Sequence, residues 1–168
     1  MIREKLFVSY DGDEGYIYAS YNHKDYELVY DILTAFYDKG YRISHDAAHN
    51  IRGDFFEYWI RMIKNCKVFF CFLSGNYIDS DTNRRELNFA YNGKKIIIPI
   101  RLDDSKIPDD ISFILSPISY ACFYEHESVE EFTDWLCEVA HEQLEPCRMN
   151  DRPEPRKPSL LERIFHRH

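Results

Sequence analysis

VFFCFLSGNYIDSDTNRREL (residues 68–87) joins an apolar strand pattern to a polar loop and then to the start of a helix. Its opening run is wholly apolar, which is typical of a central parallel strand that is covered on both faces. Glu86 lies one turn into the helix. Open α/β sheets bind small ligands outside the carboxyl ends of their strands, so we expect the Glu86 carboxylate to face such a crevice.

Strand and helix patterns alternate along the rest of the chain. Strands are expected at residues 16–20, 41–44, 67–73, 96–102 and 118–123. Helices are expected at residues 25–38, around 55–63, around 86–91 and at 128–141, with 103–117 as a loop of at most one helical turn. This alternation predicts an α/β fold: a doubly wound, five-stranded parallel sheet with helices on both faces, for which 2-1-3-4-5 is a common strand order.

Length and composition favour one domain. With 168 residues and 45% hydrophobic content, the chain can bury one sizeable core. Residues 1–15 contain a strand-like FVSY that runs at once into Asp-Gly-Asp-Glu-Gly, so we interpret them as a leader or an added edge strand. We assign residues 16–145 to the domain and the proline-rich residues 146–168 to a basic, flexible tail.

The charge distribution argues against binding to nucleic acid. Six basic and three acidic side chains give the tail a charge of +3, so residues 1–145 carry −11 when the whole chain carries −8. An acidic body repels polyanions. No stretch reaches the roughly 18 to 20 apolar residues of a membrane span, and the first residues lack the apolar core of a secretory signal. We therefore expect a cytoplasmic protein with no membrane span.

Missing motifs exclude several chemistries. The five cysteines form no CxxC pair, and His45 and His49 lie in an expected loop, so we predict no metal site. The glycines build neither GxGxxG nor GxxxxGK[ST], which removes the usual phosphate cradles. No GxSxG nucleophile elbow occurs. The expected third strand ends in Leu73 and Ser74, where a phospho-accepting receiver domain needs an aspartate.

Two polar loops follow the first and third expected strands, at residues 21–25 and 74–80. In the order 2-1-3-4-5 these strands flank the switch point, where ligands bind, and Asp46 after the second strand reaches the same rim. Several loop residues fit a purely structural role equally well, as helix N-caps or exposed loop residues: Asn22, Asp25, His23, Ser80 and Asp81. Taken together with Glu86, the two loops predict a polar pocket.

The order of four segments resembles the successive boxes of a bacterial TIR (Toll/interleukin-1 receptor) domain. The segments are YIYASYNHKD, KGYRISHD, the stretch from IRGDFF to ELNFA, and KKIIIPIRLDD. The resemblance covers roughly residues 16–141 and implies a flavodoxin-like sheet. It also implies that residues 45–53, after the second strand, form the mobile BB loop of that family.

The same resemblance implies an activity. TIR domains that cleave NAD carry a catalytic glutamate on their third helix, and the matching position is Glu86. By the resemblance, further side chains would line the pocket for NAD+: Tyr21, Asn22, His23, Asp46, Ser74, Tyr77 and Ser80. NAD+ would be the substrate of a nucleosidase, a hydrolase or a cyclase, that uses no cofactor. Because nicotinamide leaves as a neutral molecule, one carboxylate can suffice, unlike the pair that ordinary glycosidases use.

The resemblance also implies partners and leaves alternatives open. We expect self-association through TIR faces and the BB loop, with a separate effector protein in antiphage defence signalling. Many family members carry an aromatic residue and a cysteine where this chain has Thr82 and Asn83, which reduces the expected stacking on the substrate. One alternative is a non-catalytic TIR–TIR interaction scaffold, which would tolerate Glu86→Gln. Another is a nucleoside deoxyribosyltransferase-like enzyme, which fits the boxes less well.

Overall fold

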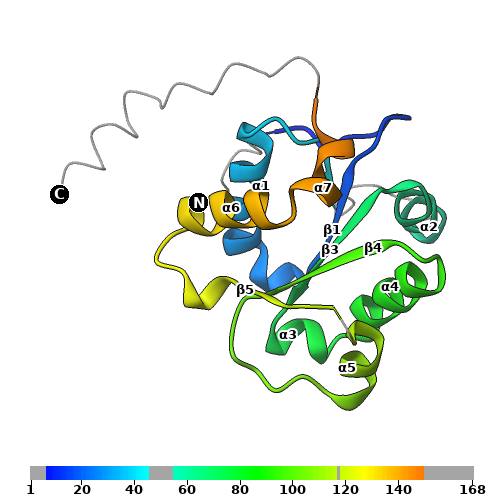
Figure 1. The fold of residues 1–168 in the computed structure, drawn as a ribbon. Coiled ribbons are helices and arrows are strands. Elements are labelled where there is room, and N and C mark those ends of the chain that lie inside the picture. The colour runs from blue at the N-terminus through cyan, green and yellow to red at the C-terminus, as the bar shows by residue number, and fades with distance from the viewer. Residues whose placement is uncertain (1–6, 46–54, 117, 150–168) are drawn as a thin grey trace.

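The computed structural model describes residues 7–45, 55–116 and 118–149 (Figure 1). The strands of this part are β1 (Ile17–Ser20), β2 (Ile43–His45), β3 (Val68–Leu73), β4 (Ile96–Arg101) and β5 (Ala121–Cys122). The α-helices are α1 (Tyr26–Asp38), α2 (Phe55–Asn65), α3 (Gly75–Ile78), α4 (Asp81–Asn92), α5 (Asp109–Leu115), α6 (Val129–Val139) and α7 (His141–Leu144). Short 3-10 helices are η1 (His23–Asp25), η3 (Phe123–Glu125) and η4 (Glu145–Cys147).

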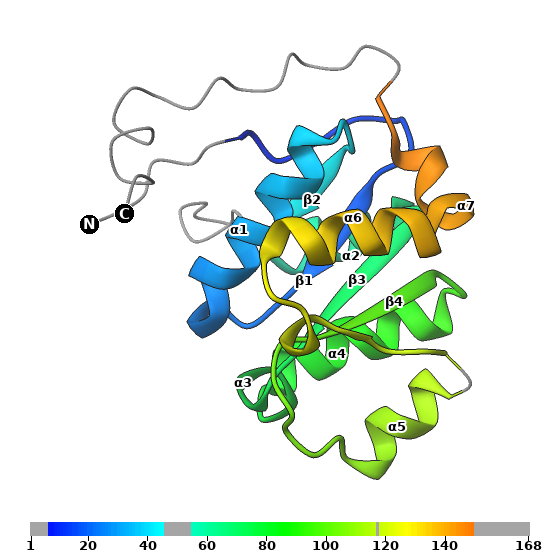
Figure 2. The same cartoon turned by 60° about the vertical axis from the view of Figure 1, so that its left-hand side comes forward.

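The strands form one parallel sheet in the order β2-β1-β3-β4-β5, which confirms the predicted fold class and strand order. Figure 2 shows α1 and α6 on one face of this sheet and α4 and α5 on the other. Ser20 at the end of β1 pairs with Cys71 of β3, so the carboxyl ends of these two strands lie side by side. The switch point therefore lies where the sequence predicts it.

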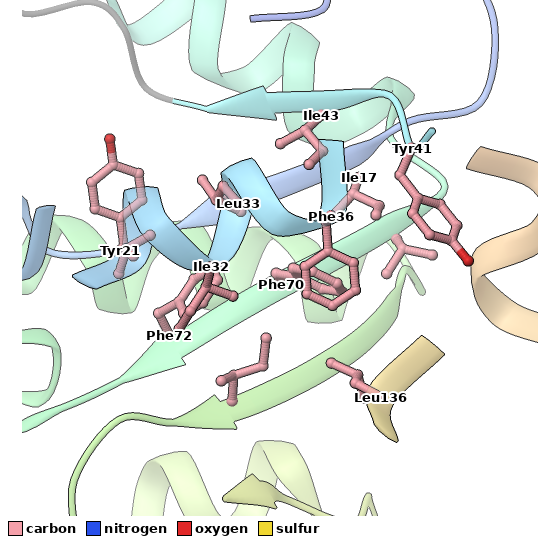
Figure 3. Close-up of a cluster of buried hydrophobic side chains, with 14 of the residues drawn as sticks. Ile17, Tyr21, Ile32, Leu33, Phe36, Tyr41, Ile43, Phe70, Phe72 and Leu136 are labelled. Atoms are coloured by element: carbon pink, nitrogen blue, oxygen red, sulfur yellow. The ribbon is translucent and has the colours of Figure 1, made fainter. Parts of the chain in front are cut away.

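Two apolar layers hold the helices on the sheet, and β3 contributes to both. Phe70 and Phe72 pack under α1 and α6, while the alternate residues Phe69 and Leu73 face α2, α4 and α5. Figure 3 shows the first layer, in which Phe36 of α1 lies against Phe70, with ring centroids 5.1 Å apart. All six residues of β3 are buried, which explains why the strand reads as a continuous apolar run.

Four local expectations differ from the structure. The predicted loop after β3 contains helix α3, because the Ser74 side chain accepts a hydrogen bond from the Tyr77 amide and caps a turn. The segment expected to hold one helical turn forms α5, whose Ile111 and Leu115 are buried against the sheet. The fifth strand is only two residues long. The last helix is divided at Ala140 into α6 and α7.

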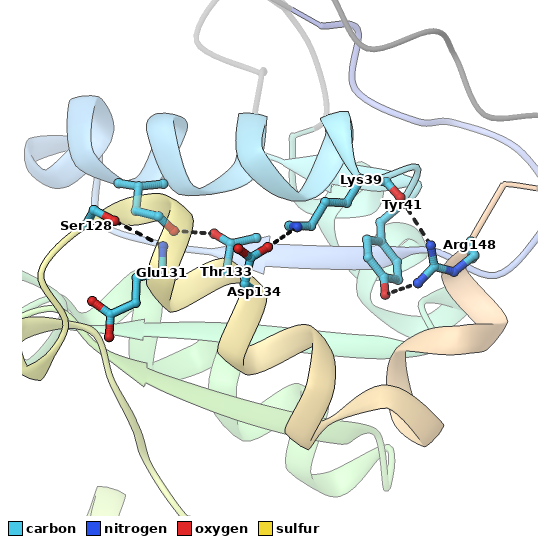
Figure 4. A network of polar contacts seen from close by, with 8 residues as sticks. Lys39, Tyr41, Ser128, Glu131, Thr133, Asp134 and Arg148 are labelled. Atoms are coloured by element: carbon cyan, nitrogen blue, oxygen red, sulfur yellow. Dashed lines mark hydrogen bonds and ion pairs between the residues drawn. The ribbon is translucent and has the colours of Figure 1, made fainter.

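Residues 146–149, which we assign to the tail, pack on the domain. The Met149 amide donates to the Gly40 carbonyl at 2.7 Å, and Gly40 has the positive φ of 93° that follows many helix ends. Figure 4 shows Arg148 donating to the Tyr41 hydroxyl at 2.7 Å and to the Lys39 carbonyl at 3.3 Å. Residues 146–149 therefore pack on the end of α1, and residues 150–168 lie outside the described residues.

The segment that precedes β1 also packs on the domain from Phe7 onward. Phe7 is buried, and its ring stacks on Tyr37 with centroids 4.8 Å apart. The Tyr10 amide donates to the Ile43 carbonyl of β2 at 2.8 Å, but residues 7–10 are not a strand. In the part of the chain that the structure describes, no helix has the length and apolar content needed to cross a membrane.

Candidate active site

Helix α4 holds Glu86 at the carboxyl edge of the sheet. The helix begins after Ser80, whose hydroxyl accepts a hydrogen bond from the backbone amide of Asn83 at 3.3 Å. Its inner face packs on the sheet through Leu87. Glu86, next to Leu87, is only 8% exposed, and its Oε2 accepts a hydrogen bond from Ser20 Oγ at 2.5 Å. A buried carboxylate thus lies against the end of β1.

Tyr77 completes the surroundings of this carboxylate. Its hydroxyl lies 2.8 Å from Ser20 Oγ, and its side chain is fully buried. Burial raises the pKa of the Tyr77 hydroxyl well above its ordinary value, and the neighbouring Cys71 and Glu86 raise it further. Burial also raises the pKa of the Cys71 thiol to about 12. Both groups therefore carry their protons at neutral pH.

A second network joins the loops after β1 and β3. Asp25 at the end of η1 accepts hydrogen bonds from Ser74 Oγ at 2.5 Å and from Asn76 Nδ2 at 3.0 Å. Both carboxylate oxygens of Asp25 thus have partners on the segment that begins α3. Asp25 makes no side-chain cap bond to α1. We interpret Asp25 as a residue that fixes the two loops relative to each other.

Asn83 fastens α4 to the same edge. Its Nδ2 donates to the Tyr21 carbonyl at 3.1 Å, and its Oδ1 accepts from Asn22 Nδ2 at 3.2 Å. Asn22 in turn caps η1, because its Oδ1 accepts from the Lys24 amide. Asn83 is 5% exposed, and its hydrogen bond to the Tyr21 carbonyl is buried, whereas the hydrogen bond from Asn22 is partly buried.

The structure places the predicted site residues in three groups. Glu86, Tyr77, Ser74 and Asn22 belong to the three sets of hydrogen bonds described above. Ser80 is the N-cap of α4, His23 is exposed in η1, and Tyr21 is buried with its carbonyl bonded to Asn83. Asp46, with most of the BB loop, lies outside the described residues.

Sequence reasoning missed Ser20 and Asn83. Side chains alternate between the two faces of a strand, so Ser20 shares the α4 face of β1 with Tyr18. This alternation could have identified Ser20 as a neighbour of Glu86. Among the described residues, no group of three or more His, Cys, Asp or Glu side chains is arranged to hold a metal ion.

A family model for the TIR domain matches residues 17–137. The chain belongs to the TIR domain family. The match spans every strand of the sheet and ends within α6, so the networks around Glu86 lie entirely inside it. A comparison with curated proteins finds no match.

Solved structures share the fold of this TIR domain at low identity. The TIR domain of the Toll-related receptor TRR-2 from Hydra magnipapillata has a TM-score of 0.62 and 17% identity, over 74% of this chain and 97% of that chain. The TIR domains of the activated Roq1 resistosome give 0.58 and 15%, over 73% and 97%. The CMP N-glycosidase BcmB of Clostridium botulinum gives 0.56 and 17%, over 73% and 98%.

Proposed function

We propose that this TIR domain cleaves the bond between nicotinamide and ribose in NAD+. The observation that carries this proposal is the buried carboxylate of Glu86 at the switch point of the sheet. Cleavage develops positive charge on the ribose, and a carboxylate in a site from which water is excluded stabilises such charge strongly. Addition of water yields nicotinamide, ADP-ribose and a proton, and attack by a group of the same nucleotide yields a cyclic product.

Cleavage of the bond between nicotinamide and ribose can be catalysed by one carboxylate. Nicotinamide leaves without needing a proton, whereas an ordinary glycoside needs a general acid as well. In the networks described here, the other carboxylate is Asp25, and both its oxygens are engaged by Ser74 and Asn76. The fold also occurs in an enzyme described as a CMP N-glycosidase, so nucleotide N-glycosidic chemistry is compatible with this architecture. We propose that NAD+ binds beside Asn22 and His23, on the exposed side of the site. We further propose that the protein acts in cytoplasmic defence signalling and needs no cofactor.

Release of nicotinamide tests this proposal. Concentrated full-length protein is incubated with NAD+, and nicotinamide is followed by chromatography for wild type, Glu86→Gln and Asp81→Asn. Asp81 is an exposed carboxylate on the same helix and serves as the matched control. We expect Glu86→Gln to reduce release at least about a hundredfold and Asp81→Asn to keep it. Equal release by wild type and Glu86→Gln would reject the catalytic assignment. Parallel reactions with CMP and a deoxynucleoside show whether the substrate is NAD+.

A second candidate function is a TIR–TIR interaction scaffold that acts without catalysis. One structural neighbour is the set of TIR domains of an activated resistosome, an assembly in which TIR domains come together. A scaffold would signal normally with Glu86→Gln and would fail with substitutions in the BB loop, residues 45–53. Such a result, together with no nicotinamide release at any protein concentration, would favour the scaffold and a separate effector as partner.

A further inference from the structure

We propose that Ser20 and Tyr77 are positioning residues that form a directed hydrogen-bond chain and hold Glu86 ionised and oriented for catalysis. The proposal rests on the proposed function of Glu86 and assigns the chain the order Tyr77, Ser20, Glu86. The Ser20 hydroxyl is the central link, since it lies 2.5 Å from Glu86 Oε2 and 2.8 Å from the Tyr77 hydroxyl. None of the three side chains is more than 8% exposed.

The direction of the chain follows from the number of protons. A serine hydroxyl has one proton to donate and lone pairs with which to accept. An ionised carboxylate only accepts, so the Ser20 proton is directed to Glu86. Ser20 Oγ must then accept from its other neighbour, which makes the Tyr77 hydroxyl the donor. Burial raises the pKa of the Tyr77 hydroxyl, so the phenol has a proton to donate.

Cys71 is a further neighbour of the hydrogen-bond chain, beside Tyr77. Its thiol is one of the neighbouring groups that raise the pKa of the Tyr77 hydroxyl, and its burial keeps the sulfur neutral. Cys71 pairs with Ser20 across the β1–β3 ladder, so the pairing of these two strands positions both Ser20 and Cys71 near Tyr77. The three supporting groups are therefore fixed by the sheet and by α3, and Glu86 alone comes from α4.

The hydrogen-bond chain has two consequences for the proposed reaction. Hydrogen bonds to the charged form of a carboxyl group favour that form, so Ser20 extends the activity of Glu86 toward acidic pH. The bond also restricts rotation of the carboxylate, which preserves its alignment with the reacting sugar. Both effects act on the chemical step, so the chain should influence kcat much more than KM.

The test compares Ser20→Ala, Tyr77→Phe and the double variant with wild type, using NAD+ and full-length protein across a range of pH. Ser20→Ala should lower kcat roughly tenfold to a hundredfold with little change in KM, and move the acid limb of the pH profile about one unit upward. Tyr77→Phe should have a smaller effect in the same direction. The double variant should resemble Ser20→Ala, because Tyr77 acts only through Ser20.

The matched control is Ser44→Ala. Ser44 is a fully buried serine on the neighbouring strand β2, and its hydroxyl has no hydrogen-bond partner among the described residues. It should keep the kcat and pH profile of wild type. A ¹³C NMR titration of the Glu86 carboxyl group supplies a readout that does not need activity, and its midpoint should move to higher pH in Ser20→Ala.

The outcomes separate the two proposals. If Glu86→Gln is inactive while Ser20→Ala keeps the wild-type kcat and pH profile, the proposed role of the hydrogen-bond chain is rejected. The proposed function of Glu86 is then retained. If wild type releases no nicotinamide, the NMR titration decides the chain alone: a shifted midpoint supports it and an unchanged midpoint overturns it. Independent, multiplying losses in the double variant would overturn the order of the chain.

Discussion

Asn83 is one of the two positions, with Thr82, at which the sequence departs from the expected TIR pattern, and in the structure its side chain joins two elements. Its side chain joins α4 to the Tyr21 carbonyl and to the Asn22 side chain while remaining 5% exposed. A buried amide in such a position costs free energy when its partners are lost, because they remain without hydrogen bonds. Asn83 thus joins α4 to the loop that follows β1.

We predict that Asn83→Cys destabilises the protein. The thiol cannot replace both hydrogen bonds, so the free energy of unfolding should fall by about 1 to 3 kcal/mol. Urea denaturation followed by circular dichroism measures this change. Thr82→Ala is the control, since Thr82 is exposed on the same turn and should shift the midpoint very little. A midpoint for Asn83→Cys equal to that of wild type would show that these two hydrogen bonds are unimportant for stability.

At the scale of elements, the sequence predicts those whose pattern is set by their own residues. Strand β3 is buried throughout and is therefore apolar throughout, and Ser80 and Gly93 flank α4 as ordinary cap residues. Helix α3 is too short to show a period, and its cap depends on Ser74, which was interpreted as a pocket residue. Strand β5 has only two residues, because the 3-10 helix η3 begins directly after it at Phe123.

The C-terminal helices offer a prediction at the same scale. A Cβ atom at Gly15 would lie 2.4 Å from the Pro146 carbonyl oxygen and 3.0 Å from Lys67 Cγ. Because the first of these is a backbone atom, Gly15→Ala should force η4 away from the start of β1. We expect a loss of about 1 to 3 kcal/mol, which lowers Tm by roughly 2 to 4 °C for each kcal/mol.

Calorimetry of Gly15→Ala and Gly12→Ala checks this expectation. A Cβ atom at Gly12 would approach only the Tyr10 side chain, which can swing aside, so that variant is the control. If both variants have the same Tm as wild type, the packing of residues 146–149 on the domain does not contribute to stability.

At the scale of the whole molecule, the candidate site exists because distant segments meet at one edge of the sheet. Ser20 and Glu86 are 66 positions apart, and Ser74 and Asp25 are 49 apart. Strand order alone brings these segments together, so the order 2-1-3-4-5 is sufficient to predict the edge of the sheet at which Glu86 lies. It was not sufficient to predict which hydroxyl contacts that carboxylate, since this depends on side-chain direction and on the unpredicted α3.

The molecule also contains three deeply buried thiols, which link its stability to pH. Burial raises the pKa of Cys66, Cys71 and Cys147 to about 12 in each case, from an ordinary value of 9.0. The unfolded chain releases these protons near pH 9, whereas the folded chain keeps them until a higher pH. The stabilisation is therefore fully present below about pH 9 and is lost as the pH rises from 9 toward 12.

We predict that the protein loses stability steeply above pH 9. Each thiol should contribute up to about 1.4 kcal/mol per pH unit in this window, because one unit of differential protonation has that value. Urea midpoints measured between pH 8 and pH 10.5 test this. Cys147→Ala should give a shallower dependence than wild type, whatever its stability at pH 8, while Cys122→Ala, at a half-buried position, should keep the wild-type slope. Parallel curves for wild type and Cys147→Ala would mean that burial of this thiol is not what couples folding to alkaline pH.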